Sequence, residues 1–130
     1  MAISTPPRGD LAAYEESVRL DVPELVAGLR DLLGARLVAY VGSVKETRAV
    51  RQWAEGTRAP SSDVIARLRA AYHVAALLRA RNSPAVVQAW FQGMNPRLED
   101  VAPARLLRDA DLAQVGPHVL AAARAFAAEG

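Results

Sequence analysis

Residues 37–56 read LVAYVGSVKETRAVRQWAEG, and their pattern predicts two short helices joined by a tight turn. The first helix covers 37–41, is apolar, and meets Gly42, which interrupts the helical pattern. The second helix is predicted over 45–55, and Gly56 follows it at the position of a helix C-cap. Its inward face is formed by Ala49, Val50, Trp53 and Ala54. This arrangement is typical of a helix-turn-helix.

The outward face of the second helix carries polar and basic side chains suited to contacting DNA. The candidate residues are Lys45, Thr47, Arg48, Arg51, Gln52 and, in the loop that follows, Arg58. Such side chains reach phosphates and base edges, while an apolar rear face fixes the orientation of the helix. The same pattern also fits a solvated helix pair that binds no DNA, because helix pairs with a glycine in the turn are common.

The positive charge of the chain is concentrated around this helix-turn-helix. The formal net charge is +2, but residues 36–81 hold nine basic and three acidic residues. Residues 1–35 hold three basic and six acidic residues, and residues 82–130 hold four and five. A basic segment of this kind is the pattern that a nucleic-acid-binding surface leaves in a sequence.

Upstream of the motif, residues 1–21 are predicted to form a flexible N-terminal arm. Residues 1–10 are rich in proline and polar residues and are expected to be disordered, while 11–20 form a loosely specified helix. A better-defined helix follows over 22–33, because Asp21 is a good N-cap and apolar residues recur at helical spacing.

Downstream of the motif, a long helix is predicted from a cap at Ser61 or Ser62 as far as Arg81. This helix joins two regions of the chain. The first region, residues 22–81, contains the predicted helix-turn-helix and resembles a DNA-binding region. The second region covers residues 82–130.

The second region is predicted to contain three helices. Pro84 opens the first, a turn at residues 95–96 follows it, and Pro103 opens a second, short helix. The last helix, over 112–128, is expected to kink or break at Gly116-Pro117. Proline lacks the backbone donor that a helix needs and opposes the helical conformation of the residue before it.

Length and composition limit the fold and the chemistry. A chain of 130 residues supports one compact domain, or two small helical subdomains that share a core. With 52% hydrophobic but 5% aromatic residues, an all-α protein is expected. There is no cysteine and no apolar run long enough to span a membrane, so we expect a cytoplasmic protein. His73 and His118 stand alone, so neither a metal site, a cofactor nor a catalytic role is predicted.

Four motifs of the chain resemble those of one known family. Residues 50–56 read VRQWAEG, residues 58–61 read RAPS, residues 89–100 read AWFQGMNPRLED, and residues 102–109 read APARLLRD. They resemble the MbcA/ParS/Xre antitoxin family, and the similarity covers roughly residues 24–128. The resemblance implies an Xre-like helix-turn-helix bundle, joined by the long helix to a small helical toxin-binding domain over the second region.

The resemblance also implies a function. Members of this family are antitoxins of type II toxin-antitoxin systems, and they bind toxins with a RES domain that degrade NAD. Carried over by position, the toxin contacts would be Trp90, Phe91, Met94, Asn95, Pro96, Arg97, Phe126, Glu129 and Gly130. The chain is then expected to block the toxin sterically, to bind operator DNA, and to form a homodimer or a larger complex with its toxin. A stand-alone helix-turn-helix regulator and a pure protein-interaction module are the alternatives.

Overall fold

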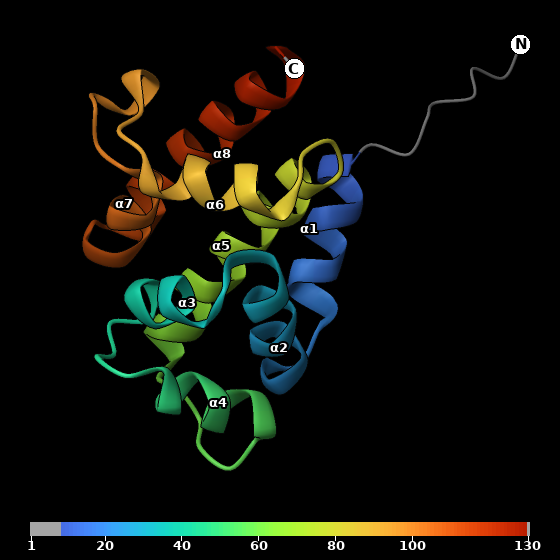
Figure 1. Ribbon diagram of the computed structural model, residues 1–130, viewed down its shortest axis with the longest axis vertical. Helices are drawn as coiled ribbons and strands as arrows, with labels where there is room; N and C mark the ends of the chain where they lie inside the picture. The colour runs from blue at the N-terminus through green and yellow to red at the C-terminus, as the bar shows by residue number, and fades with distance from the viewer. Residues whose placement is uncertain (1–8, 130) are drawn as a thin grey trace, which may run out of the picture.

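The computed structural model describes residues 9–129, and the all-α class predicted from the sequence is confirmed for them (Figure 1). The helices are α1 (Gly9–Arg19), α2 (Val22–Leu33), α3 (Ala35–Val41), α4 (Thr47–Glu55), α5 (Ser62–Arg79), α6 (Pro84–Gln92), a 3-10 turn η1 (Pro96–Leu98), α7 (Pro103–Asp109) and α8 (Leu112–Glu129). Within the described residues, no helix is both long and apolar enough to cross a bilayer.

Helix α5 is the centre of the fold. It contacts α1, α2 and α3, which precede it in the chain, and α6, α7 and α8, which follow it. Leu68, Ala71, Ala75 and Leu78 of α5 are fully buried in a hydrophobic core to which every α-helix contributes. The predicted regions 22–81 and 82–130 therefore share one core and differ in the surfaces that they expose.

The caps predicted around α2 and α4 form as expected. Asp21 Oδ1 accepts a hydrogen bond from the Glu24 backbone at 3.0 Å, and the Glu24 carboxylate reaches back to the backbone N–H of Asp21. Gly56 ends α4 in the left-handed conformation with φ 79°. Helix α4 begins at Thr47 rather than at Lys45, because its N-cap Glu46 is extended. Lys45 therefore belongs to the turn.

Gly42 determines how closely α3 and α4 approach. A Cβ atom at this position would lie 2.9 Å from Trp53 Cζ3, 3.0 Å from Trp53 Cη2 and 3.2 Å from the Val38 carbonyl oxygen. Only glycine leaves room for the indole ring, which is 2% exposed. Trp53 therefore rests directly on the turn and fixes the orientation of α4.

The helix predicted over residues 11–20 forms, as α1, but it belongs to the packed fold and not to a flexible arm. Residues 9–19 form α1, which packs along α5. Arg69 Nη1 donates to the carbonyl oxygens of Ser17 and Leu20, both at 2.8 Å, and the Tyr72 hydroxyl donates to the Glu16 carboxylate. These bonds come from a helix far along the chain, so local sequence does not reveal them. Residues 1–8 lie outside the described residues.

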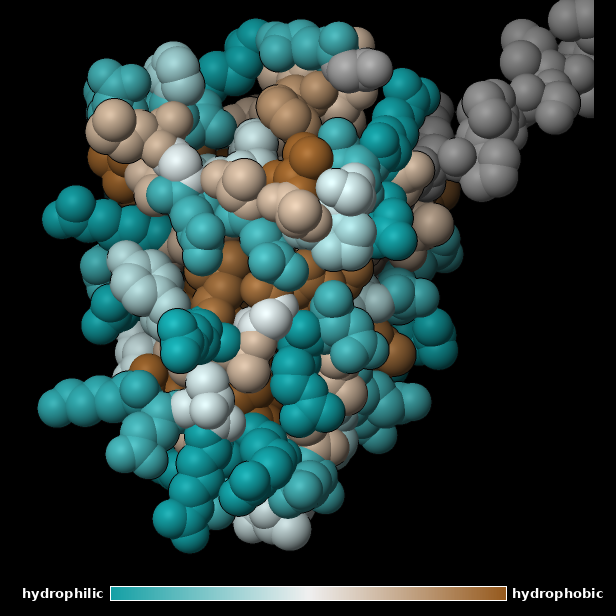
Figure 2. All heavy atoms as spheres, viewed as in Figure 1, coloured by the Kyte–Doolittle hydropathy of each residue, from teal (hydrophilic) through white to brown (hydrophobic). Residues whose placement is uncertain are grey.

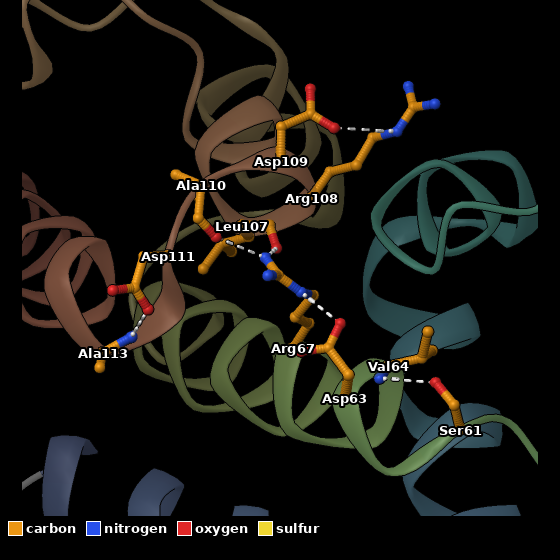
Figure 3. Close-up of polar contacts among 10 residues, drawn as sticks. All are labelled: Ser61, Asp63, Val64, Arg67, Leu107, Arg108, Asp109, Ala110, Asp111 and Ala113. Carbon is orange, nitrogen blue, oxygen red and sulfur yellow. Dashed lines mark hydrogen bonds and ion pairs between the residues drawn. The ribbon is translucent and has the colours of Figure 1, made fainter.

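A second arginine of α5 holds α7 in place (Figure 3). Arg67 Nη1 donates to the carbonyl oxygens of Leu107 and Ala110, each at 2.8 Å, and its Nε donates to Asp63 at 3.0 Å. These carbonyls lie at the C-terminal end of α7, where helix carbonyls have no partner within the helix. The Arg67 side chain is only 14% exposed, so the two regions of the chain are joined by a nearly buried polar contact.

A kink or a break is expected at Gly116-Pro117, and no break occurs there, because α8 continues from Leu112 to Glu129. Two features reduce the cost of the internal proline. Gly116 has no Cβ to clash with the proline ring, and Pro117 and Ala113 are exposed, so the carbonyl that loses its partner faces water. Burial of the small apolar side chains on the inner face of α8, Val119, Ala122 and Ala123, then outweighs the one lost bond.

Candidate nucleic-acid interface and partner groove

Helix α4 presents a polar face that its own core residues hold in position. Thr47, Arg48 and Arg51 are exposed and Gln52 is half-buried, while Ala49, Val50 and Trp53 are buried behind them. Figure 1 shows α4 at one end of the molecule, and Figure 2 shows mostly hydrophilic side chains at that end. A helix held in this way can enter the major groove of DNA without rearrangement.

Two adjoining hollows surround the N-terminal end of α4, with volumes of about 410 and 580 Å³. They share Val44, Lys45, Glu46 and Arg48, and together we call them the α4 groove. The predicted DNA contacts that line it are Lys45, Thr47, Arg48, Gln52 and Arg58. Arg51 is exposed on α4 but does not line either hollow.

Sequence reasoning missed Arg36, which also lines the α4 groove. It lies in the first turn of α3, nine residues before Lys45, and tertiary packing brings it beside Thr47 and Arg48. The signal in the sequence was its place at the start of the first helix of the motif, the helix that crosses the DNA backbone in helix-turn-helix complexes. The groove thus combines four cationic side chains with the carboxylate of Glu46.

A different groove, of about 420 Å³, lies between the end of α6, η1 and α8. We call it the terminal groove. The predicted toxin contacts that line it are Trp90, Met94, Asn95, Pro96, Arg97, Phe126 and Glu129. The assignment of Phe91 as a toxin contact is wrong, because its side chain is fully buried and offers no surface to a partner. Gly130 lies outside the described residues.

The terminal groove has an aromatic floor and a polar rim. The rings of Trp90 and Phe126 lie 6.4 Å apart between centroids, and Met94 beside them is 80% exposed. At the rim, Arg97 Nη2 donates to Glu129 Oε1 at 2.8 Å, and Asn95 Oδ1 accepts from the Arg97 backbone at 2.9 Å. Aromatic side chains, methionine and arginine are enriched at protein interfaces, so the chemistry of this groove suits a protein partner.

Elsewhere, burial raises the pKa of Tyr72, and its hydrogen bond to Glu16 raises it further. This hydroxyl belongs to the contact between α1 and α5. His73 packs edge-on against Tyr14, with 5.5 Å between ring centroids. Within residues 9–129, no three side chains of the metal-ligating types cluster as a metal site requires.

The α4 groove and the terminal groove lie at opposite ends of the molecule, with α5 between them (Figure 1). A ligand bound at one end therefore leaves the other accessible. No protein-family model, curated protein or solved structure matches the chain.

Proposed function

We propose that the chain is an antitoxin of a type II toxin-antitoxin system, which binds a RES-domain toxin through the terminal groove and operator DNA through the α4 groove. The observation that carries this proposal is the separation of the basic α4 groove from the terminal groove, which has an aromatic floor and the exposed side chain of Met94. The class of toxin rests on the resemblance of residues 50–61 and 89–109 to the MbcA/ParS/Xre family.

On the toxin side, the exposed side chain of Met94 supplies the apolar anchor of the interface, beside the floor formed by Trp90 and Phe126. A few such anchors at the centre of a contact carry most of its binding free energy. The Arg97–Glu129 pair is more than half exposed, so opening it costs at most about 1 kcal/mol. Both charges are then free to pair with the toxin. The antitoxin inhibits sterically, because a protein seated over the mouth of the toxin's cleft denies NAD access to it.

On the DNA side, α4 inserts into the major groove. Arg48, Arg51 and Gln52 are placed to reach base edges and phosphates from its outward face. One copy reads one half-site, so an inverted repeat requires a homodimer whose two α4 helices are spaced about one helical turn of DNA apart.

The first experiment co-expresses the chain with the product of the neighbouring gene and records growth and co-purification. The wild-type chain should restore growth and co-purify. Met94→Asp should abolish both, because it places a charge at the centre of the apolar contact. Val18→Asp is the matched control, since Val18 is another exposed apolar side chain, 55% accessible on α1. Equal rescue by both variants would refute the terminal groove as the toxin site.

A second experiment measures binding to the inverted repeat upstream of the chain's own gene by electrophoretic mobility shift. The double variant Arg48→Ala, Arg51→Ala should weaken binding strongly, because each bidentate base contact is worth about 1–3 kcal/mol. Unchanged affinity would exclude α4 as the reading helix.

A stand-alone transcriptional regulator is the second candidate. The Arg97–Glu129 pair favours it, because this pair closes the rim of the terminal groove within the chain itself. Operator binding without any toxic neighbour or complex in the co-expression experiment would select this function.

A further inference from the structure

We propose that the DNA-contact surface extends beyond the α4 groove onto α7, so that Arg36 of α3 together with Arg105 and Arg108 of α7 holds the phosphate backbone of the same duplex. The inference rests on the proposed DNA binding and adds α7, which the sequence assigned to the toxin-binding region, to the DNA interface. It names three phosphate contacts that no motif indicated.

A third hollow, of about 370 Å³, connects the two regions of the chain. Arg36 and Tyr40 of α3 line one side of it, Arg105 of α7 lines the other, and Gln92 lies at the end of α6. Arg36 and Tyr40 also line the α4 groove. The two surfaces are therefore continuous, and a ligand that fills the α4 groove passes the mouth of this hollow. Figure 2 shows the surface hollowed between α3 and α6.

The charged residues that line this hollow are all cationic. Arg36 and Arg105 are both exposed, and none of the residues lining the hollow is acidic. Arg108 lies one helical turn after Arg105, and its guanidinium carbon sits 4.6 Å from the centroid of the Tyr40 ring. Figure 3 shows this guanidinium pointing away from Arg67. It keeps one ion pair, with Asp109 at 3.5 Å, and its side chain is 39% exposed.

The position of this surface selects duplex DNA as its ligand. A helix in the major groove is flanked on both sides by phosphate backbones, because the groove is only about 12 Å wide. In helix-turn-helix complexes the first helix of the motif crosses one of these backbones. Here that helix is α3, which carries Arg36, and Arg105 and Arg108 extend the same basic surface outward.

The test is the salt dependence of binding to a random-sequence duplex of about 25 base pairs, measured by fluorescence anisotropy between 50 and 200 mM salt, conditions in which phosphate contacts dominate affinity. Each phosphate contact contributes about 0.9 to the slope of log K against log salt. The double variant Arg36→Ala, Arg105→Ala should therefore lower the magnitude of the slope by about 1.8. Both side chains are exposed, so circular dichroism should show an unchanged fold.

Two further variants separate local contact from overall charge. Arg79→Ala with Arg81→Ala removes the same two charges from exposed positions near the end of α5, and it should leave the slope at the wild-type value. Arg36→Lys with Arg105→Lys keeps both charges and should retain the slope.

A slope lowered by no more than about 0.9, the contribution of Arg36 alone, would overturn the role of α7 while leaving α4 as the DNA-binding helix. Absence of salt-dependent binding by the wild-type chain would instead overturn DNA binding as a whole. The two failures are thus distinguishable.

Discussion

Gly42→Ala is the substitution that tests most directly how α3 and α4 are held together at their turn. The new Cβ would lie 2.9 Å from Trp53 Cζ3 and 3.2 Å from the Val38 carbonyl oxygen. Backbone strain does not contribute, because Gly42 has φ −79°. The buried indole has no free space to retreat into, so the cost is that of overpacking a core, about 1–3 kcal/mol.

This cost translates into a measurable shift of Tm. At about 2.1 cal/mol/K per residue, a chain of 130 residues loses about 4 °C of Tm for each kcal/mol. We therefore expect Gly42→Ala to lower Tm by about 4–11 °C. Thermal unfolding is followed by circular dichroism at 222 nm, because this signal is unaffected by the tryptophan substitution described next.

A double-mutant cycle with Trp53→Phe identifies the clash as the cause. Phenylalanine lacks the outer ring atoms that meet the new methyl group, although its smaller ring leaves a cavity. It also removes an indole N–H that has no hydrogen-bond partner among the described residues. The double variant should therefore be more stable than the sum of the single effects, by about 0.5–3 kcal/mol. A wild-type Tm for Gly42→Ala, or strictly additive effects, would refute this account of the turn.

Three other predictions concern the remaining polar contacts. Arg67→Met should lower the free energy of unfolding in urea by about 2–4 kcal/mol, because it removes the donor to both carbonyls. Arg67→Lys should recover only part of this stability, because lysine lacks the guanidinium fork. Full recovery by lysine would show that the positive charge alone is responsible. The raised pKa of Tyr72 means that its stabilising effect is complete below about pH 10 and is lost as pH rises further, since the unfolded phenol ionises first. Tm measured from pH 9 to 11.5 should fall less steeply for Tyr72→Phe, and parallel curves would contradict this. Arg97→Ala should change stability by at most about 1 kcal/mol, because its ion pair with Glu129 is exposed, and a larger loss would assign the pair a structural role.

Much of the fold could be predicted because its helix boundaries are set by local chemistry. The caps at Asp21, Ser61 and Ser83 bond to backbone N–H groups three residues ahead, so a short window of sequence contains the whole interaction. Gly56 was equally readable, since the left-handed conformation that ends α4 favours glycine.

The packing of helix α1 could not be predicted from its hydrophobic pattern, because the large apolar residues of the helix face the solvent. Its large apolar residues Leu11, Tyr14 and Val18 are 56%, 51% and 55% exposed, whereas small Ala13 and Ser17 face the core. Close packing of small residues on α5 and hydrogen bonds from distant side chains hold this helix. Neither leaves a periodic signal in the sequence.

Of the candidate site, too, some residues could be predicted from the sequence and others could not. The polar face of α4 could be read from helical spacing, because Arg48, Arg51 and Gln52 alternate with buried apolar residues along one helix. Arg36 could not, because only the packing of α3 against α4 brings it into the groove. Phe91 was assigned to the surface by motif position, yet it lies on the inward side of α6.

The hydrogen bonds of Arg67 and Arg69 in α5 can form only at different times during synthesis of the chain. The carbonyls of Ser17 and Leu20, in α1 and directly after it, are made 52 and 49 residues before Arg69, so at roughly 5–20 residues per second they wait some 2–10 s on the ribosome. The α7 carbonyls that Arg67 serves are made 40 and 43 residues after it. A nascent chain that ends with α5 contains both partners of the Arg69 contacts, while the Arg67 guanidinium stays solvated until α7 is made. Translation speed across α6 and α7 therefore sets how long a half-finished, basic intermediate persists.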